Sequence, residues 1–213
     1  MLNKELVIKV GGFSRETVTE DIDIIATLHT FLRKHGWKYR MVFTTDPVCW
    51  TECPKSLQML GRQRRRWQLG LIQTVIKHDK MIFDPRYRST GMLSMPFHAY
   101  VEAMGSVVEA AGTIILPLSF LVGAMPWSLF LLMMVLAFAY GTLLSMGSVL
   151  LAEATVRRYP SYRDLLTLML YAFLENIGYR QLTTFYRAQG VISFFFGKRK
   201  WELVEHKGAE SWA

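Results

Sequence analysis

The sequence is 213 residues long and has 51% hydrophobic and 13% aromatic residues, a composition that excludes a disordered chain. Lys and Arg outnumber Asp and Glu by 25 to 17, which gives a formal charge of +8 and an isoelectric point near 9.6. This surplus indicates an anionic partner: nucleic acid, phospholipid head groups or a phosphorylated small molecule.

Cys49 and Cys53 lack the partners of a zinc site, and we interpret them as reduced cysteines in a loop.

The N-terminal residues predict an α/β unit. Leu6–Val10 is a β-prone run that ends at two glycines, and Tyr39–Phe43 predicts a second strand. Between them a helix ending near Gly36 is predicted by apolar residues three and four positions apart: Ile22, Ile24, Ile25, Leu28, Phe31 and Leu32. A strand–helix–strand unit cannot bury both faces of its sheet, so we expect more of this domain before Met1 or on another chain.

An acidic segment, Thr19-Glu20-Asp21, stands at the start of that predicted helix. Together with Asp23, its carboxylates would stabilise the first helical turn through the helix dipole. Alternatively, Asp21 could accept a proton from a substrate hydroxyl, with Glu20 beside it.

A second helix is predicted from Ser56. Its apolar positions are Leu57, Leu60, Trp67, Leu71, Val75 and Ile76, and its arginines are Arg62, Arg64, Arg65 and Arg66. These arginines would form a solvated or lipid-facing surface, or Arg66 would hold a diphosphate beside the flat face of Trp67. Nucleic-acid binding is disfavoured because no recognised binding module is present.

A membrane hairpin is predicted further on. Residues His78–Pro96 are predicted to be irregular. Further along, Ala110–Ala152 contains no Asp, Glu, Lys, Arg or His. This run suits two transmembrane helices with a turn at Pro126-Trp127; the alternative is a buried hairpin of a soluble core. Basic residues flank it on both sides, which predicts cytoplasmic ends: Lys77, Lys80, Arg86, Arg88, Arg157, Arg158 and Arg163.

A third apolar segment, Leu165–Ile177, is interrupted by Glu175 and Asn176. It is either a short or re-entrant span or part of a basic tail at the membrane interface, and its topology stays open.

Thr19-Glu20-Asp21, followed by Gln63-x-x-Arg66-Trp67 and then by membrane helices, resembles the C-terminal half of processive family 2 glycosyltransferases, the cellulose, hyaluronan, chitin and poly-N-acetylglucosamine synthases. The resemblance covers most of the chain. It implies a GT-A-type α/β domain, an interfacial helix and two or three transmembrane helices, with an export channel for the product.

The resemblance also implies roles for single residues. Asp21 would be the general base and Glu20 would shape the site. Arg66 would hold the nucleotide diphosphate, Gln63 would line the acceptor site, and Trp67 would stack on the terminal sugar. Thr19 is the remaining expected substrate-binding residue. No metal ligand is assigned: Mg²⁺ or Mn²⁺ is expected on an Asp-x-Asp motif outside this chain, because Asp21-Ile22-Asp23 overlaps the base motif.

The expected domains are the end of the catalytic domain (1–55), the interfacial helix with its loop (56–97), the transmembrane region (98–180) and a basic tail (181–213). The expected enzyme is a multi-pass hexosyltransferase of the inner (plasma) membrane, with a cytoplasmic catalytic face, acting in exopolysaccharide synthesis. Its partners are a nucleotide sugar, a glycan acceptor, the lipid bilayer and a separate N-terminal donor-binding half, without which it is expected to be inactive.

The alternatives are a non-catalytic membrane protein with a lipid- or partner-binding helix, and a transferase that adds one sugar to a lipid carrier.

Overall fold

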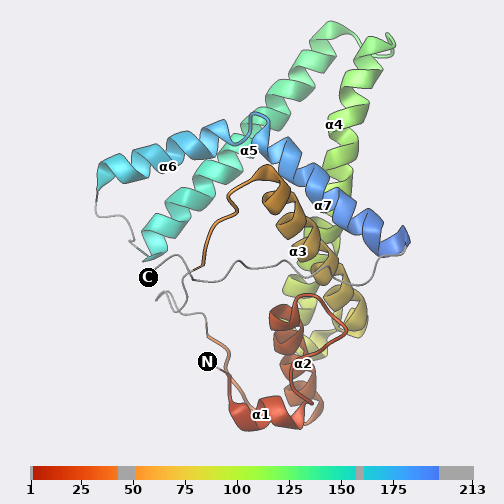
Figure 1. The fold of residues 1–213 in the computed structure, drawn as a ribbon, viewed down its shortest axis with the longest axis vertical. Helices are drawn as coiled ribbons and strands as arrows, with labels where there is room; N and C mark the ends of the chain where they lie inside the picture. The colour runs from red at the N-terminus through yellow and green to blue at the C-terminus, as the bar shows by residue number, and fades with distance from the viewer. Residues whose placement is uncertain (1, 43–50, 157–160, 197–213) are drawn as a thin grey trace.

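The computed structural model describes residues 2–42, 51–156 and 161–196, and all regular elements in these ranges are helical (Figure 1). The α-helices are α1 Lys4–Lys9, α2 Glu20–Lys34, α3 Leu57–Lys77, α4 Gly105–Leu121, α5 Trp127–Val156, α6 Tyr162–Leu174 and α7 Tyr179–Phe196. Between α3 and α4 lie two short 3-10 turns, η1 Asp79–Met81 and η2 Pro85–Tyr87, and two π-helical segments, η3 Thr90–Ser94 and η4 Phe97–Met104.

The predicted strand at Leu6–Val10 is wrong, because these residues belong to α1 and its C-terminal end. The side chain of Asn3 caps this helix by accepting hydrogen bonds from the amides of Glu5 and Leu6, at 3.0 and 3.2 Å. Residues 39–42 form no strand either, and Phe43 lies outside the described residues. No β-sheet is therefore present in the described part of the chain, and the expected α/β layer is not seen there.

The predicted end of α2 near Gly36 and the predicted start of α3 at Ser56 are confirmed, whereas Ser14 and Thr17, the other residues that could cap the first of these helices, lie before its start. Thr19 is the N-cap of α2, and Gly36 follows its end with a φ of +67°, a conformation that glycine adopts readily. Ser56 is the N-cap of α3, and its hydroxyl accepts a hydrogen bond from the amide of Met59 at 3.2 Å.

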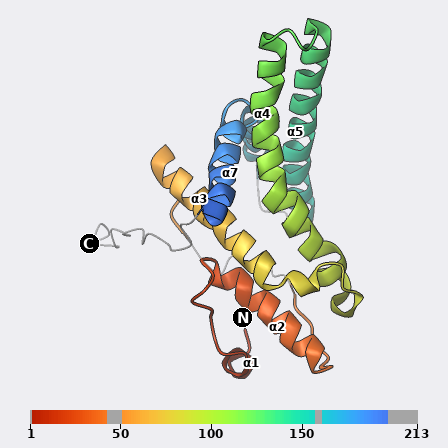
Figure 2. The same ribbon diagram turned by 90° about the vertical axis from the view of Figure 1, so that its right-hand side faces the viewer.

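Helix α3 is the centre of the fold and packs against α7 and η4 (Figures 1 and 2). Helices α3 and α7 approach closely at Gly190 of α7, where an added Cβ atom would lie 2.8 Å from the carbonyl oxygen of Arg65 on α3. The core at this contact consists of Leu71, Ile72, Val75, Ala99, Ala103 and Val191.

The apolar face predicted for α3 is only partly right. Leu60, Leu71 and Val75 are buried, but Leu57, Trp67 and Ile76 are exposed. The helix turns a different stripe toward α7 and η4, so these three residues stay outside the core.

In the described ranges, two helices are long and apolar enough to cross a membrane: Thr90–Leu121, which includes α4, and α5. They form a hairpin that projects away from α1 and α2, and its turn ends at Pro126, as predicted (Figures 1 and 2). In their most apolar windows only 11% and 6% of the residues are buried inside the protein. Such exposed apolar surface is unusual for the core hairpin of a soluble protein.

The irregular structure predicted up to Pro96 is wrong over its last part, since the helix that leads into α4 begins at Thr90. Pro96 lies inside this helix, between η3 and η4, where it has no N–H to donate to the preceding turn.

The third apolar segment forms α6 and a bend before α7. With 13 residues, α6 is about 20 Å long, shorter than the hydrocarbon core of about 30 Å. At the bend, Asn176 packs on Gly141 of α5, and Arg180 forms a 2.7 Å ion pair with Glu109 of α4. The bend is therefore fixed against the middle of the hairpin.

Candidate active site

A cavity of about 510 Å³ lies where the N-terminus of α2 meets α3, η4 and α7. Its lining is Thr19, Glu20, Asp21, Ile22, Arg64, Arg66, Trp67, Gln68, Leu71, Glu102 and Arg187. The charged groups are three carboxylates and three guanidiniums, so the site can hold an anion while keeping a carboxylate beside it.

The two sequence motifs meet in this cavity. Thr19, Glu20 and Asp21 line it from α2, and Arg66 and Trp67 line it from α3. Gln63, one turn earlier on α3, is half-buried and lies outside the lining.

Close packing between α3 and the start of α2 sets the position of Thr19. A Cβ atom on Gly70 would lie 2.5 Å from Cγ2 of Thr19, so only glycine leaves room for this contact. One turn further along α3, the side chain of Gln73 accepts a hydrogen bond from the amide of Val18 at 2.9 Å. The Thr19 hydroxyl is buried and has no hydrogen-bond partner among the described residues.

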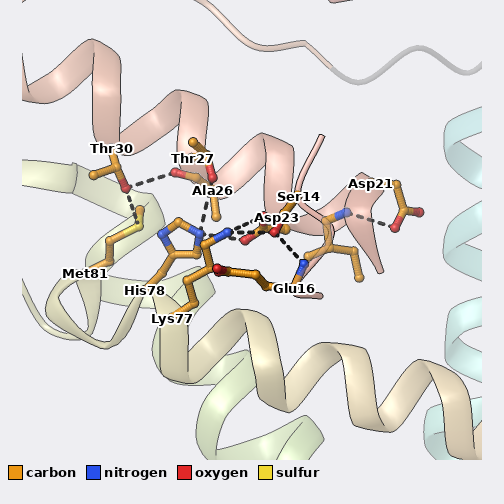
Figure 3. Close-up of polar contacts among 11 residues, drawn as sticks. Ser14, Glu16, Asp21, Asp23, Ala26, Thr27, Thr30, Lys77, His78 and Met81 are labelled. Carbon is orange, nitrogen blue, oxygen red and sulfur yellow. Dashed lines mark hydrogen bonds and ion pairs between the residues drawn. The ribbon is translucent and has the colours of Figure 1, made fainter. Parts of the chain in front are cut away.

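Asp21 is exposed in the first turn of α2. Its Oδ1 atom accepts a hydrogen bond from the amide of Ile22 at 2.9 Å, as Figure 3 shows. The predicted place of the acidic residues at a helix N-terminus is confirmed, since Glu20, Asp21 and Asp23 all lie in the first turn of α2. Its second oxygen is available to a proton donor in the cavity.

Trp67 is 48% exposed, which leaves a large aromatic surface at the cavity. The guanidinium of Arg64 lies over its ring, 5.1 Å from the ring centroid. This contact holds the orientation of the indole.

Gln68, Glu102 and Arg187 were not predicted as site residues. Gln68 is 3% exposed; its amide donates to the carbonyl oxygens of Glu102 and Ala103 at 3.0 and 3.2 Å. Arg187 donates to Oε1 of Gln68 at 3.0 Å and to the carbonyl oxygen of Glu102 at 2.9 Å. These bonds join α3, η4 and α7 beneath the cavity.

A second, more apolar cavity of about 350 Å³ adjoins the first and shares Asp21, Ile22 and Leu71 with it. Its remaining lining is Ile25, Ala26, His29, Thr74, Val75, Thr90, Ser94, Met95 and His98. Asp21 therefore stands between a charged cavity and an apolar one.

Among the described residues, no group of three or more His, Cys, Asp and Glu side chains is arranged to hold a metal ion. The expected Mg²⁺ or Mn²⁺ does not fit the described side chains, and none of them is assigned to it. Cys53 is exposed, and Cys49 lies outside the described residues.

Comparison with known proteins shows the family of this chain. The family described as "Glycosyl transferase family group 2" matches residues 1–143, about two thirds of the sequence. The chain belongs to this family of glycosyltransferases. A segment of 81 residues, 38% of the chain, is 28% identical to "Chitin synthase 8" of Mycosarcoma maydis and covers 4% of that protein. No solved structure matches the chain.

Proposed function

We propose that this chain supplies the acceptor side of the active site in a membrane glycosyltransferase that extends a polysaccharide from a nucleotide-diphosphate sugar. The observation that carries the proposal is the cavity in which Asp21, Arg66 and Trp67 come together from two helices. Family membership supports glycosyl transfer, and the similarity to a protein named as a chitin synthase supports a polysaccharide product.

In the proposed reaction, Asp21 takes the proton of the acceptor hydroxyl as the acceptor oxygen bonds to the anomeric carbon of the donor sugar. The bond between that carbon and the diphosphate breaks, and the nucleoside diphosphate leaves with the electron pair. Arg66 stabilises the leaving group through paired, charge-assisted hydrogen bonds. Attack from the side opposite the leaving group inverts the anomeric centre.

Trp67 would hold the terminal acceptor sugar, whose C–H edges stack on an exposed aromatic face. Glu20 and Thr19 complete the wall of the cavity around Asp21. Gln63 stays a prediction for the acceptor site.

The donor sugar and its metal ion would be held by a GT-A-type part outside the described residues. Without that part we expect no transfer by this chain.

The site would face the cytoplasm of the inner (plasma) membrane, with the hairpin of α4 and α5 crossing the bilayer. The supporting observation is the exposed apolar surface of both helices. The expected basic flanks are consistent with this orientation, although Arg157 and Arg158 lie outside the described residues.

A second candidate function is the addition of one sugar to a lipid carrier. The apolar cavity beside Asp21 favours it, because that cavity could receive the apolar part of a lipid-linked acceptor. Product length separates the two functions: repeated addition gives a ladder of glycans, and single addition gives one product.

The test is a transfer assay in membranes that contain this chain together with a donor-binding partner domain, supplied with radiolabelled nucleotide sugars. Asp21→Asn removes the base and is expected to lower transfer by about 10²–10⁴-fold. Asp79→Asn, an exposed substitution of the same kind, should leave transfer unchanged. Undiminished product with Asp21→Asn would overturn the assignment of the base.

A further inference from the structure

Asp23, two residues after Asp21, is 1% exposed and lies on another face of α2. Its Oδ2 atom accepts a hydrogen bond from Nζ of Lys77 at 2.8 Å, and its Oδ1 atom lies 2.9 Å from Nε2 of His78. Figure 3 shows both contacts at the end of α3, with Asp21 pointing away from them. Lys77 also donates to the hydroxyl of Ser14 at 3.1 Å. Asp23 therefore connects α2, the end of α3 and the segment before α2.

These contacts continue a single face of α3. Arg66, Gly70, Gln73 and Lys77 follow one another at spacings of four, three and four residues, so they lie along one side of the helix. Arg66 lines the cavity, while the three later residues contact the segment that contains the acidic motif. The pairing at Lys77 is thus one of three contacts, with those of Gly70 and Gln73, that place the first turn of α2 along α3 and Asp21 relative to Arg66.

A buried carboxylate loses its hydration, and its ion pairs largely offset that loss without adding much net stability. Such a pair fixes geometry more than it stabilises the fold. We propose that Asp23 is a positioning residue whose contacts with Lys77 and His78 hold Asp21 at the cavity of Arg66 and Trp67. The catalytic part of this inference rests on the proposed role of Asp21 as the base.

The test compares Asp23→Asn with Asp79→Asn, an exposed aspartate beside His78, in the full chain in lipid nanodiscs. The first readout is hydrogen exchange at the amides of residues 23–26, which donate the first backbone hydrogen bonds of α2, and it needs no activity. We expect these amides to exchange at least about tenfold faster in Asp23→Asn and at the wild-type rate in Asp79→Asn. Equal exchange in the two variants would overturn the inference.

The second readout is transfer in the presence of the donor-binding partner domain. Asp23→Asn should lower kcat by about 10- to 100-fold per folded molecule, with an unchanged KM for the nucleotide sugar, because Arg66 and Trp67 stay on α3. Asp23→Glu, which keeps the charge, should recover part of the rate.

A double variant separates positioning from a general loss of fold. If Asp23 acts through Asp21, then adding Asp23→Asn to Asp21→Asn lowers the residual rate no further. A further loss of the same size as in the single variant would show an independent effect and overturn the inference.

If Asp23→Asn does not fold, the same measurements are made on Lys77→Met, with the exposed Lys80→Met as its control. Lys77→Met removes one partner of Asp23 and leaves the pair between Asp23 and His78 in place. If wild-type membranes make no product, the proposed function fails. The exchange measurement still decides whether Asp23 fixes the first turn of α2.

Discussion

Arg66 and Arg62 are one helical turn apart on α3 but have different surroundings. Arg66 is half-buried at the cavity, whereas Arg62 is exposed and outside it. Lysine keeps the charge of arginine but loses the planar pair of donors that matches a diphosphate. We expect Arg66→Lys to raise the KM for the nucleotide sugar about tenfold and Arg62→Lys to leave it unchanged. If both substitutions were neutral, only charge would matter, as in binding to anionic lipid.

Gln68 makes all its side-chain hydrogen bonds inside the protein. Replacing it by leucine would leave the carbonyl oxygen of Ala103 and the guanidinium of Arg187 without this partner. We expect Gln68→Leu to lower the free energy of unfolding by about 1–3 kcal/mol. The measurement is thermal unfolding in detergent, where each kcal/mol corresponds to about 2–4 °C for a chain of this size. Gln58→Leu, on the exposed first turn of α3, is the control and should leave the Tm unchanged.

The pKa of His29 is lowered from its ordinary value of 6.5, mainly by burial and further by the positive charge of Arg33. Below pH 6.5 the unfolded chain therefore binds more protons at this position than the folded one, so His29 lowers stability as the pH falls. We expect His29→Gln to reduce the loss of Tm between pH 7.5 and pH 5.5. An identical pH dependence of Tm in His29→Gln and wild type would contradict the prediction.

At the scale of single elements, the sequence predicts what local chemistry controls. Ser56 and Gly36 mark helix ends because a hydroxyl cap and a positive φ act over a few residues. The run Leu6–Val10 is predicted wrongly because its β-propensity is weak compared with the cap at Asn3. Trp67 belongs to the predicted apolar stripe of α3, but the position of α7 decides which face of the helix is buried.

Gly70 allows α3 to contact the N-terminus of α2. An added methyl group would overlap the side chain of Thr19 and move the acidic segment away from Arg66. We expect Gly70→Ala to lower transfer at least about tenfold, although alanine is the better helix former. The matched control is Gly112→Ala in α4, where nothing lies within 4 Å of the added carbon. Wild-type transfer by Gly70→Ala would show that Thr19 can move without affecting the site.

At the scale of the whole molecule, the two site motifs can be found in the sequence because each is a short continuous segment. The rest of the site cannot, since Arg187 is 119 residues from Gln68 and no local pattern connects them. The membrane hairpin is predicted from its uncharged length alone. Its relation to the site is set by the helix Thr90–Leu121, which carries Glu102 of the cavity, and by the ion pair between Arg180 of α7 and Glu109 of α4.

The orientation of the hairpin decides whether the site faces the cytoplasm, as we propose. With 30 residues, α5 is about 45 Å long, enough to cross a hydrocarbon core of about 30 Å and emerge on both sides. If it crosses, the turn at Ala124 and the loop at Cys53 lie on opposite sides of the membrane, and the cavity lies on the side of Cys53.

Labelling with a membrane-impermeant maleimide in sealed, right-side-out vesicles tests this arrangement. We expect Ala124→Cys, made in a chain with Cys49→Ser and Cys53→Ser, to be labelled without detergent. In a chain that carries only Cys49→Ser, Cys53 should be labelled only once detergent has opened the vesicles, since basic flanks favour the cytoplasmic side. Labelling of both positions before detergent would mean that the hairpin does not cross, and the cavity would then lie outside, away from its donor.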